Sequence, residues 1–214
     1  MKTAILIDGG FYRVRARKCL GDKTPYERAN ELINYCYRHV CKRSDIYRIY
    51  YYDCPPLEND VYNPVTKTAV HLRKSDQYRW MNDFLATLSK KRKLALRLGT
   101  ISDVSIGYSL KTESTKRLLN GKLDVSAISE NDLKLNVSQK GVDMKIGIDI
   151  ATLAFKKQAD KIVLIAGDSD FVPAAKLARR EGIDFVLDPL GAHITDDLSL
   201  HIDGLITKDT SFKG

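Results

Sequence analysis

The sequence has no apolar run long enough to cross a lipid bilayer. IVLIA at 162–166, among the longest, is far shorter than the roughly 20 residues of a membrane-spanning helix. The first ten residues, MKTAILIDGG, contain one lysine and a short apolar run that Asp8 interrupts at once. They predict a first strand and not a secretory signal. We therefore expect a soluble, cytoplasmic protein.

Cysteines are few, and their spacing matches no common metal-binding or redox motif. No CxxC pair occurs, and no histidine lies at a zinc-finger distance from Cys19, Cys36, Cys41 or Cys54. Reduced and mostly buried thiols are the expected state, and a structural zinc site is the alternative. A dinucleotide-binding site is not expected, because no GxGxxG follows the first strand. Asp8 would also place a negative charge opposite the pyrophosphate.

The composition indicates a globular protein that attracts polyanions. Hydrophobic residues make up 43% and charged residues 29% of the 214 positions. Lysine and arginine number 35 against 27 acidic residues, which gives a net charge of +8 and favours nucleic acid as a partner. Because there is no internal repeat or linker, we expect one domain over residues 1–214 with residues 102–138 as an insertion.

Hydrophobic periodicity predicts strands that alternate with helices. Strands are expected at 3–8, 45–53, 93–101, 161–168 and 183–189. Helices are expected at 25–42, about 67–90, 142–158, 171–181 and 194–202. Within the insertion, KLDVSAIS (122–129) and DLKLNVS (132–138) alternate apolar and polar residues and predict a small hairpin. The whole pattern is typical of an α/β fold with a mostly parallel central sheet of about five strands.

Acidic residues stand at the ends of the predicted elements. Asp8 ends the first strand before two glycines, Asp168 ends the strand at 161–168, and Asp143 begins the helix at 142–158. Asp170 follows two positions after Asp168, and each of these acids taken singly is explained by a helix cap or turn. Ligands of open α/β sheets bind beyond the carboxyl ends of the strands. If the acids converge there, their carboxylates suit Mg²⁺ or Mn²⁺.

Two further residues are expected to support such a site without binding the ion. Asp149 lies six positions after Asp143, which places it about 120° around the helix, so the two cannot easily share one ion. Ser169 lies between the two acids of GDSD. A purely structural role for Asp149 is an equal alternative.

Basic residues provide candidate contacts to a phosphate backbone. They lie after Asp8 at Arg13, Arg15, Arg17 and Lys18, in KKRK at 90–93, and at Lys140. A solvated helix face or turn explains such charges equally well.

Three motifs in order resemble the signatures of a known family. ILIDGGFY (5–12), QKGVDMKIGIDIA (139–151) and IAGDSDFVPAAK (165–176) resemble the NYN domain, a PIN-like, Rossmann-type nuclease superfamily. KGVD together with GDSDF is similar to its bacterial branch. The resemblance covers residue 3 to about 205, apart from the insertion. Many family members have a polar residue shortly after the first acid, where this chain has Gly10 and Phe11.

The resemblance implies an endoribonuclease that depends on a divalent metal. The family's metal-binding and catalytic acids carry over to Asp8, Asp143, Asp168 and Asp170, and Asp149 matches an acid often present in the same helix. Mg²⁺ or Mn²⁺ would be the cofactor and single-stranded or structured RNA the partner. The insertion at 102–138 is a candidate surface for a second copy or another protein.

Two rival functions remain at this point. A phosphatase of the haloacid-dehalogenase type also uses an acid at the end of its first strand, but it needs a second acid two positions later, where this chain has Gly10. A non-catalytic RNA-binding or protein-interaction module on the same fold is the stronger rival, because a fold does not guarantee activity. Clustered acids count against it, since they repel a polyanion.

Overall fold

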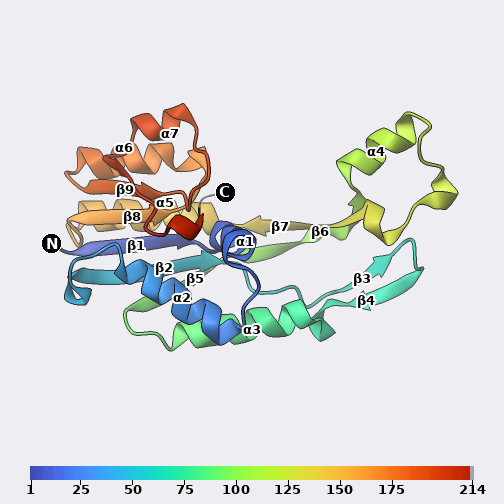
Figure 1. The fold of residues 1–214 in the computed structure, drawn as a ribbon, viewed down its shortest axis with the longest axis horizontal. Coiled ribbons are helices and arrows are strands. Elements are labelled where there is room, and N and C mark those ends of the chain that lie inside the picture. Colours follow the sequence, from blue (N-terminus) through green and yellow to red (C-terminus); the bar gives the residue numbers. More distant parts are fainter. Residues whose placement is uncertain (213–214) are drawn as a thin grey trace.

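Six parallel strands form the central sheet (Figure 1). The computed structural model describes residues 1–212, apart from the side chains of residues 103–105. The strand order is β10-β9-β8-β1-β2-β5, with bounds β1 Thr3–Asp8, β2 Ile46–Asp53, β5 Leu94–Leu98, β8 Lys161–Ile165, β9 Asp184–Asp188 and β10 Gly204–Leu205. The expected α/β class is confirmed, with the two-residue strand β10 added to the five expected strands.

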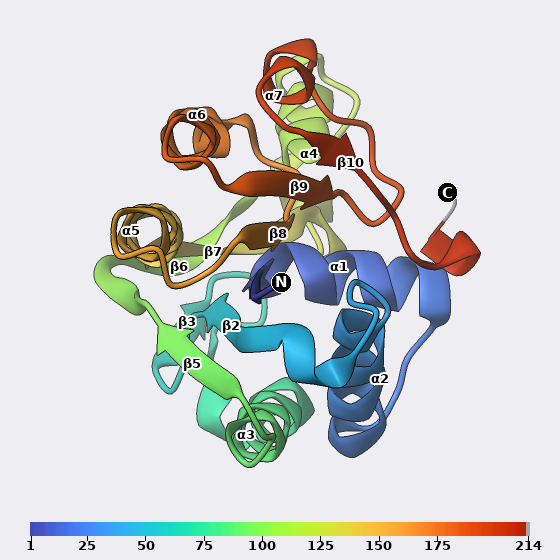
Figure 2. The ribbon, with the colours of Figure 1, turned by 90° about the vertical axis from the view of Figure 1, so that its left-hand side faces the viewer.

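Helices cover both faces of the sheet and give the three layers of a Rossmann-like, PIN-like fold (Figure 2). On one face pack α1 (Gly9–Leu20), α2 (Pro25–Tyr37) and α3 (Asp76–Ser89); on the other pack α5 (Val142–Phe155) and α6 (Val172–Arg180). Further helices are α7 (Asp196–Leu200) and the 3-10 turns at Arg43–Asp45, Leu72–Lys74, Val125–Ala127, Glu130–Asp132, Ser169–Phe171 and Thr210–Phe212. No helix within residues 1–212 combines the length and apolar character needed to span a membrane.

The two central strands are apolar along nearly their whole length because both of their faces are buried. Residues 4–7 of β1 and 162–165 of β8 are completely shielded from solvent. Strand order reverses between these two strands: from β1 the chain runs through β2 to β5, and it then returns to β8, β9 and β10 on the other side. In open α/β folds, such a switch point is where ligands bind.

Two segments differ from the expectations. The basic segment after Asp8 is the helix α1, which begins directly at the end of β1 with Asp8 as its N-cap. The helix expected over about 67–90 starts only at Asp76, where the Ser75 hydroxyl accepts a hydrogen bond from Tyr78 N. Before it, β4 (Thr68–His71) pairs antiparallel with β3 (Asp60–Asn63).

A long arm leaves the carboxyl edge of the sheet after β5 (Figure 1). β6 (Thr100–Leu110) and β7 (Leu133–Lys140) form its antiparallel ribbon, and α4 (Thr112–Leu119) lies in the connection between them. The expected pairing of 122–129 with 132–138 is therefore wrong: β7 pairs with residues 100–110, and residues 122–129 contain the 3-10 turn at 125–127. Asn63 Nδ2 donates to Glu130 Oε1 at 2.8 Å and ties the β3–β4 hairpin to this arm.

Candidate active site at the carboxyl edge of the sheet

The switch point between β1 and β8 brings acids from both halves of the chain to one edge. β1 and β8 pair in parallel up to Ile7 and Ile165, so Asp8 and the GDSD turn leave the sheet on the same side. Asp8 is partly buried, whereas Asp168 and Asp170 are exposed. Asp143 lies in the first turn of α5 and is also exposed.

The electrostatic surroundings of Asp8 and Asp143 connect the four acids. The pKa of Asp8 is raised to about 6, chiefly by burial and then by the charges of Asp143 and Asp53, although a hydrogen bond from Phe11 N opposes the rise. Burial also raises the pKa of Asp143, together with the charges of Asp168 and Asp170. The four acids, Asp8, Asp143, Asp168 and Asp170, therefore form one electronegative edge, which we call the acid edge.

Local caps account for only part of this arrangement. Asp8 Oδ1 accepts a hydrogen bond from Phe11 N at 3.1 Å, and Asp168 Oδ1 accepts one from Asp170 N at 3.0 Å. These are the helix-cap and turn roles that the sequence predicted as the alternative for each acid. Among residues 1–212, no lysine, arginine or histidine nitrogen lies within 4.0 Å of a carboxylate oxygen of the four acids. Their charge is thus left without a basic partner in the part of the chain that the structure describes.

The donor chemistry of this edge fits a hard divalent cation. Carboxylate oxygens are the preferred ligands of Mg²⁺ and Mn²⁺. Within the described residues, however, no three acid, histidine or cysteine side chains lie close enough together to form a metal centre. The four acids thus lie at one edge of the sheet, but they do not form a complete set of metal ligands.

A fifth acid, Asp53, was missed by the sequence analysis. It ends β2, the strand beside β1, and its side chain is completely buried. Arg13 binds it with two nitrogens, at 2.9 and 3.0 Å, while the Tyr51 hydroxyl and Cys54 N donate at 2.9 and 2.8 Å. The available signal was the aspartate that closes DIYRIYYYD, as Asp8 closes TAILID.

The predicted nucleic-acid contacts have different surroundings. Arg13 is held by Asp53, and Arg15 donates to the carbonyl oxygens of Leu190 and Phe212. Both guanidinium groups thus connect parts of the fold. The Arg17 side chain is 76% exposed and pairs with Asp22, while Lys140 is exposed at the end of β7, three positions before Asp143. The exposed members of the predicted set are Arg17, Lys18, Lys90, Arg92 and Lys140.

The two predicted supporting residues lie in different places. Asp149 accepts hydrogen bonds from the Tyr52 hydroxyl at 2.8 Å and from Arg97 Nε at 2.9 Å. These bonds join α5 to β2 and β5, so they hold in place the helix that carries Asp143. Ser169 is partly buried in the 3-10 turn between Asp168 and Asp170.

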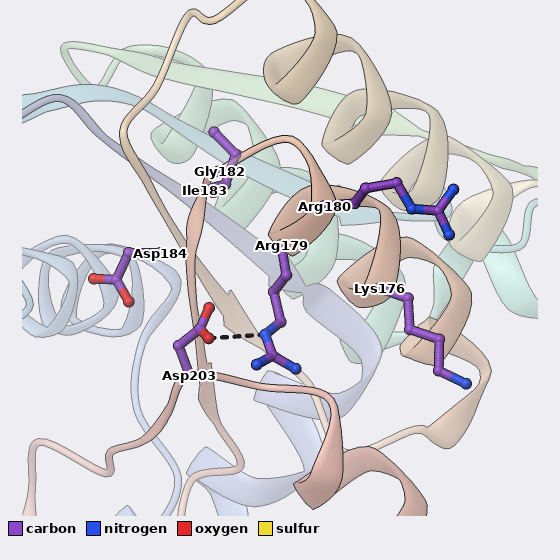
Figure 3. Close-up of a pocket in the computed structure, with 7 residues that line it drawn as sticks. All are labelled: Lys176, Arg179, Arg180, Gly182, Ile183, Asp184 and Asp203. Atoms are coloured by element: carbon purple, nitrogen blue, oxygen red, sulfur yellow. Dashed lines mark hydrogen bonds and ion pairs between the residues drawn. The ribbon is translucent and has the colours of Figure 1, made fainter.

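An open hollow of about 730 Å³ lies at the opposite edge of the sheet, beside the first residue of β9 (Figure 3). Its lining is Lys176, Arg179, Arg180, Gly182, Ile183, Asp184 and Asp203. Arg179 Nε pairs with Asp203 at 2.8 Å across it. None of the four acids of the carboxyl edge contributes to this hollow.

The fold places the chain in the class of Rossmann-like α/β proteins, with a topological switch point between β1 and β8. The chain belongs to the NYN domain family, which it matches over residues 2–193. NYN domains have the PIN-like nuclease fold and are generally ribonucleases. The family prediction from the three motifs is thereby confirmed.

A similar fold occurs in a protein of unknown function from Vibrio parahaemolyticus. The two structures share a TM-score of 0.51 at 13% sequence identity, over 99% of this chain and 94% of the other. At this identity the likeness concerns the fold alone. No curated protein matches the sequence.

Replacing Asp8 with asparagine is expected to remove a pH-dependent loss of stability in metal-free protein. The pKa of Asp8 is about 6 in the folded chain against the ordinary aspartate value of 3.8, so the folded state binds the proton more tightly than the unfolded state. The wild type should therefore lose stability as pH rises between these values. Asp8→Asn should not, because an asparagine side chain does not ionise. Thermal melting in EDTA across this window should show a melting-temperature difference in favour of the variant that grows with pH. A difference independent of pH would contradict the assignment.

Proposed function

We propose that this NYN domain is a divalent-metal-dependent endoribonuclease. The observation that carries the proposal is the position of Asp8, Asp143, Asp168 and Asp170 at the carboxyl edge of a fold whose family members are generally ribonucleases. An acidic edge alone would repel RNA. A divalent cation held by these acids would offset that repulsion.

The four acids would hold Mg²⁺ or Mn²⁺. When bound, such an ion polarises the phosphoryl oxygen and lowers the pKa of a coordinated water. The chain's own residues position the acids: the capping bond from Phe11 N orients Asp8, and the Arg13–Asp53 pair fixes α1 against the end of β2. Asp149 anchors α5 through Tyr52 and Arg97, and Lys140 provides an exposed charge for a substrate phosphate.

Cleavage of an end-labelled single-stranded RNA by the purified protein tests this function. The expected result is fragmentation within the strand in Mg²⁺ or Mn²⁺ and intact RNA in EDTA. Restoring the ion to the EDTA-treated protein should restore cleavage. RNA that is retained equally well with or without metal and never cut would instead identify a binding module on the same fold.

A further inference from the structure

A groove lies between the arm and the body of the molecule. It has a volume of about 410 Å³ and lies between the start of α3, the Pro55–Pro56 segment and the ribbon of β6 and β7. A second hollow of about 470 Å³ lies alongside and shares three of the lining residues, Arg13, Gln77 and Trp80. The two hollows thus form one extended depression.

The groove begins at the end of β2, next to Asp53. Cys54, which lines it, follows Asp53 at the end of β2, and the charge of Asp53 acts on Asp8. On the arm, the lining ends at Gln139, four positions before Asp143. An RNA strand with a phosphate at the acids would therefore continue along the groove.

The arm presents an apolar face to this groove. Leu135 and Val137 of β7 line it and are partly exposed, whereas Asn136 and Ser138 point to the opposite face of the ribbon and are exposed. Across the groove stand the aromatic rings of Tyr78 and Trp80. Surfaces of this kind stack on the flat faces of nucleobases.

Polar groups accompany the apolar surfaces. Gln77 and Gln139 bring side-chain amides to the groove, and amides both donate and accept hydrogen bonds, as base edges do. Arg73 and Lys74 are exposed between the lining residues Leu72 and Ser75, which places two positive charges at the rim. The rim charges complement a phosphate backbone, in a chain of net charge +8.

The groove is held open by contacts on both sides. Asn63 Nδ2 donates to Glu130 Oε1 at 2.8 Å and fixes the β3–β4 hairpin to the arm, while the Tyr78 hydroxyl donates to Glu58 at 2.9 Å. Trp80 donates from Nε1 to the carbonyl oxygen of Lys23 at 2.9 Å and stacks on Phe84. The aromatic rings are thus ordered before any ligand arrives, which lowers the entropy cost of binding.

We propose that this groove binds unpaired nucleobases of the RNA whose backbone reaches the acid edge. The inference rests on the proposed ribonuclease function and adds to it a preference for single-stranded substrate. Bases in a duplex have their faces stacked and their edges paired, so they are not free to enter between the ribbon and the aromatic rings.

Binding in EDTA tests the groove separately from catalysis. Fluorescence anisotropy would compare a labelled single strand of about 12 nucleotides, within the length that such grooves bind, with the same strand in a duplex. Val137→Asp and Asn136→Asp are a matched pair, because they add the same charge to opposite faces of β7. Tyr78→Ala removes a ring, and thermal melting confirms that each variant is folded.

The wild type is expected to bind the single strand more tightly than the duplex. Val137→Asp and Tyr78→Ala should each weaken single-strand binding about 10-fold, the loss of one stacked base, while Asn136→Asp stays within about 3-fold of the wild type. Equal losses for Val137→Asp and Asn136→Asp, equal binding of duplex, or no binding of RNA by the wild type would overturn the inference. Single-strand binding lost selectively in these variants, in a protein that never cuts RNA, would keep the groove and reject the nuclease.

Discussion

Asp168→Asn is expected to slow metal-dependent RNA cleavage by about 100- to 1000-fold or more, since holding a catalytic cation supplies several kcal/mol of transition-state stabilisation. Asparagine keeps the shape of the side chain and the oxygen that accepts from Asp170 N, but it removes the negative charge. Asp168 is exposed, so the free energy of unfolding should change by less than about 0.5 kcal/mol. Single-turnover cleavage rates and urea unfolding measure the two effects.

Asp184→Asn provides the matched control for this variant. Asp184 begins β9 at the opposite edge of the sheet, where it pairs with Lys161 at 2.9 Å. Its replacement should leave the cleavage rate within about 2-fold of the wild type, because Asp184 lies at the opposite end of the strands from the four acids. A similar loss of rate in both variants would show that general charge, and not the carboxyl edge, governs activity.

Gly9→Ala is expected to destabilise the fold by about 3 kcal/mol or more, at the upper end of the cost of overpacking. A Cβ at position 9 would lie 2.5 Å from Tyr51 Cζ and 2.6 Å from the carbonyl oxygen of Tyr52. Tyr51 is completely buried, and the Tyr52 carbonyl belongs to a central strand, so neither atom can move aside cheaply. α1 would have to move away from β2, and this movement would disturb the hydrogen bond from Phe11 N to Asp8 Oδ1.

Gly10→Ala, one position further along the same helix, should have the opposite effect. Its Cβ would meet only Asp8 Oδ1, at 3.4 Å, an ordinary contact distance. Alanine in a helix loses less conformational entropy on folding than glycine, which favours the variant by about 0.5–1 kcal/mol. Urea unfolding of both variants measures the contrast. Equal effects of the two substitutions would mean that the approach of α1 to β2 is less tight than the structure shows.

The strands of the central sheet were predictable because burial on both faces makes them apolar throughout. Helix α1 was not, because four basic residues, Arg13, Arg15, Arg17 and Lys18, obscure a narrow buried stripe that includes Tyr12 and Ala16. The second strand of the β3–β4 hairpin was taken for the start of a helix, because a contact that holds the hairpin, Asn63 with Glu130, comes from a segment far along the chain. Local periodicity contains no information about such a contact.

The acid edge was predictable only in part, for a related reason. Asp8, Asp53 and Asp188 each end a parallel strand, and sequence alone does not separate them. The structure does: Asp188 is completely buried, with bonds to His39 and Thr207, and Asp53 is buried against Arg13, whereas Asp8 faces other acids. The difference lies in which residues the tertiary fold brings next to each carboxylate.

The central place of β1 determines when the acid edge can exist during synthesis. One neighbour of β1, β2, follows soon after it, but the other begins only at Lys161, and parallel pairing over such separations is slow to form. At ribosomal rates, the interval between these two strands is roughly 8–30 s. During that time the GDSD turn does not yet exist, so a growing chain has no complete acid edge until Asp168 and Asp170 have been added.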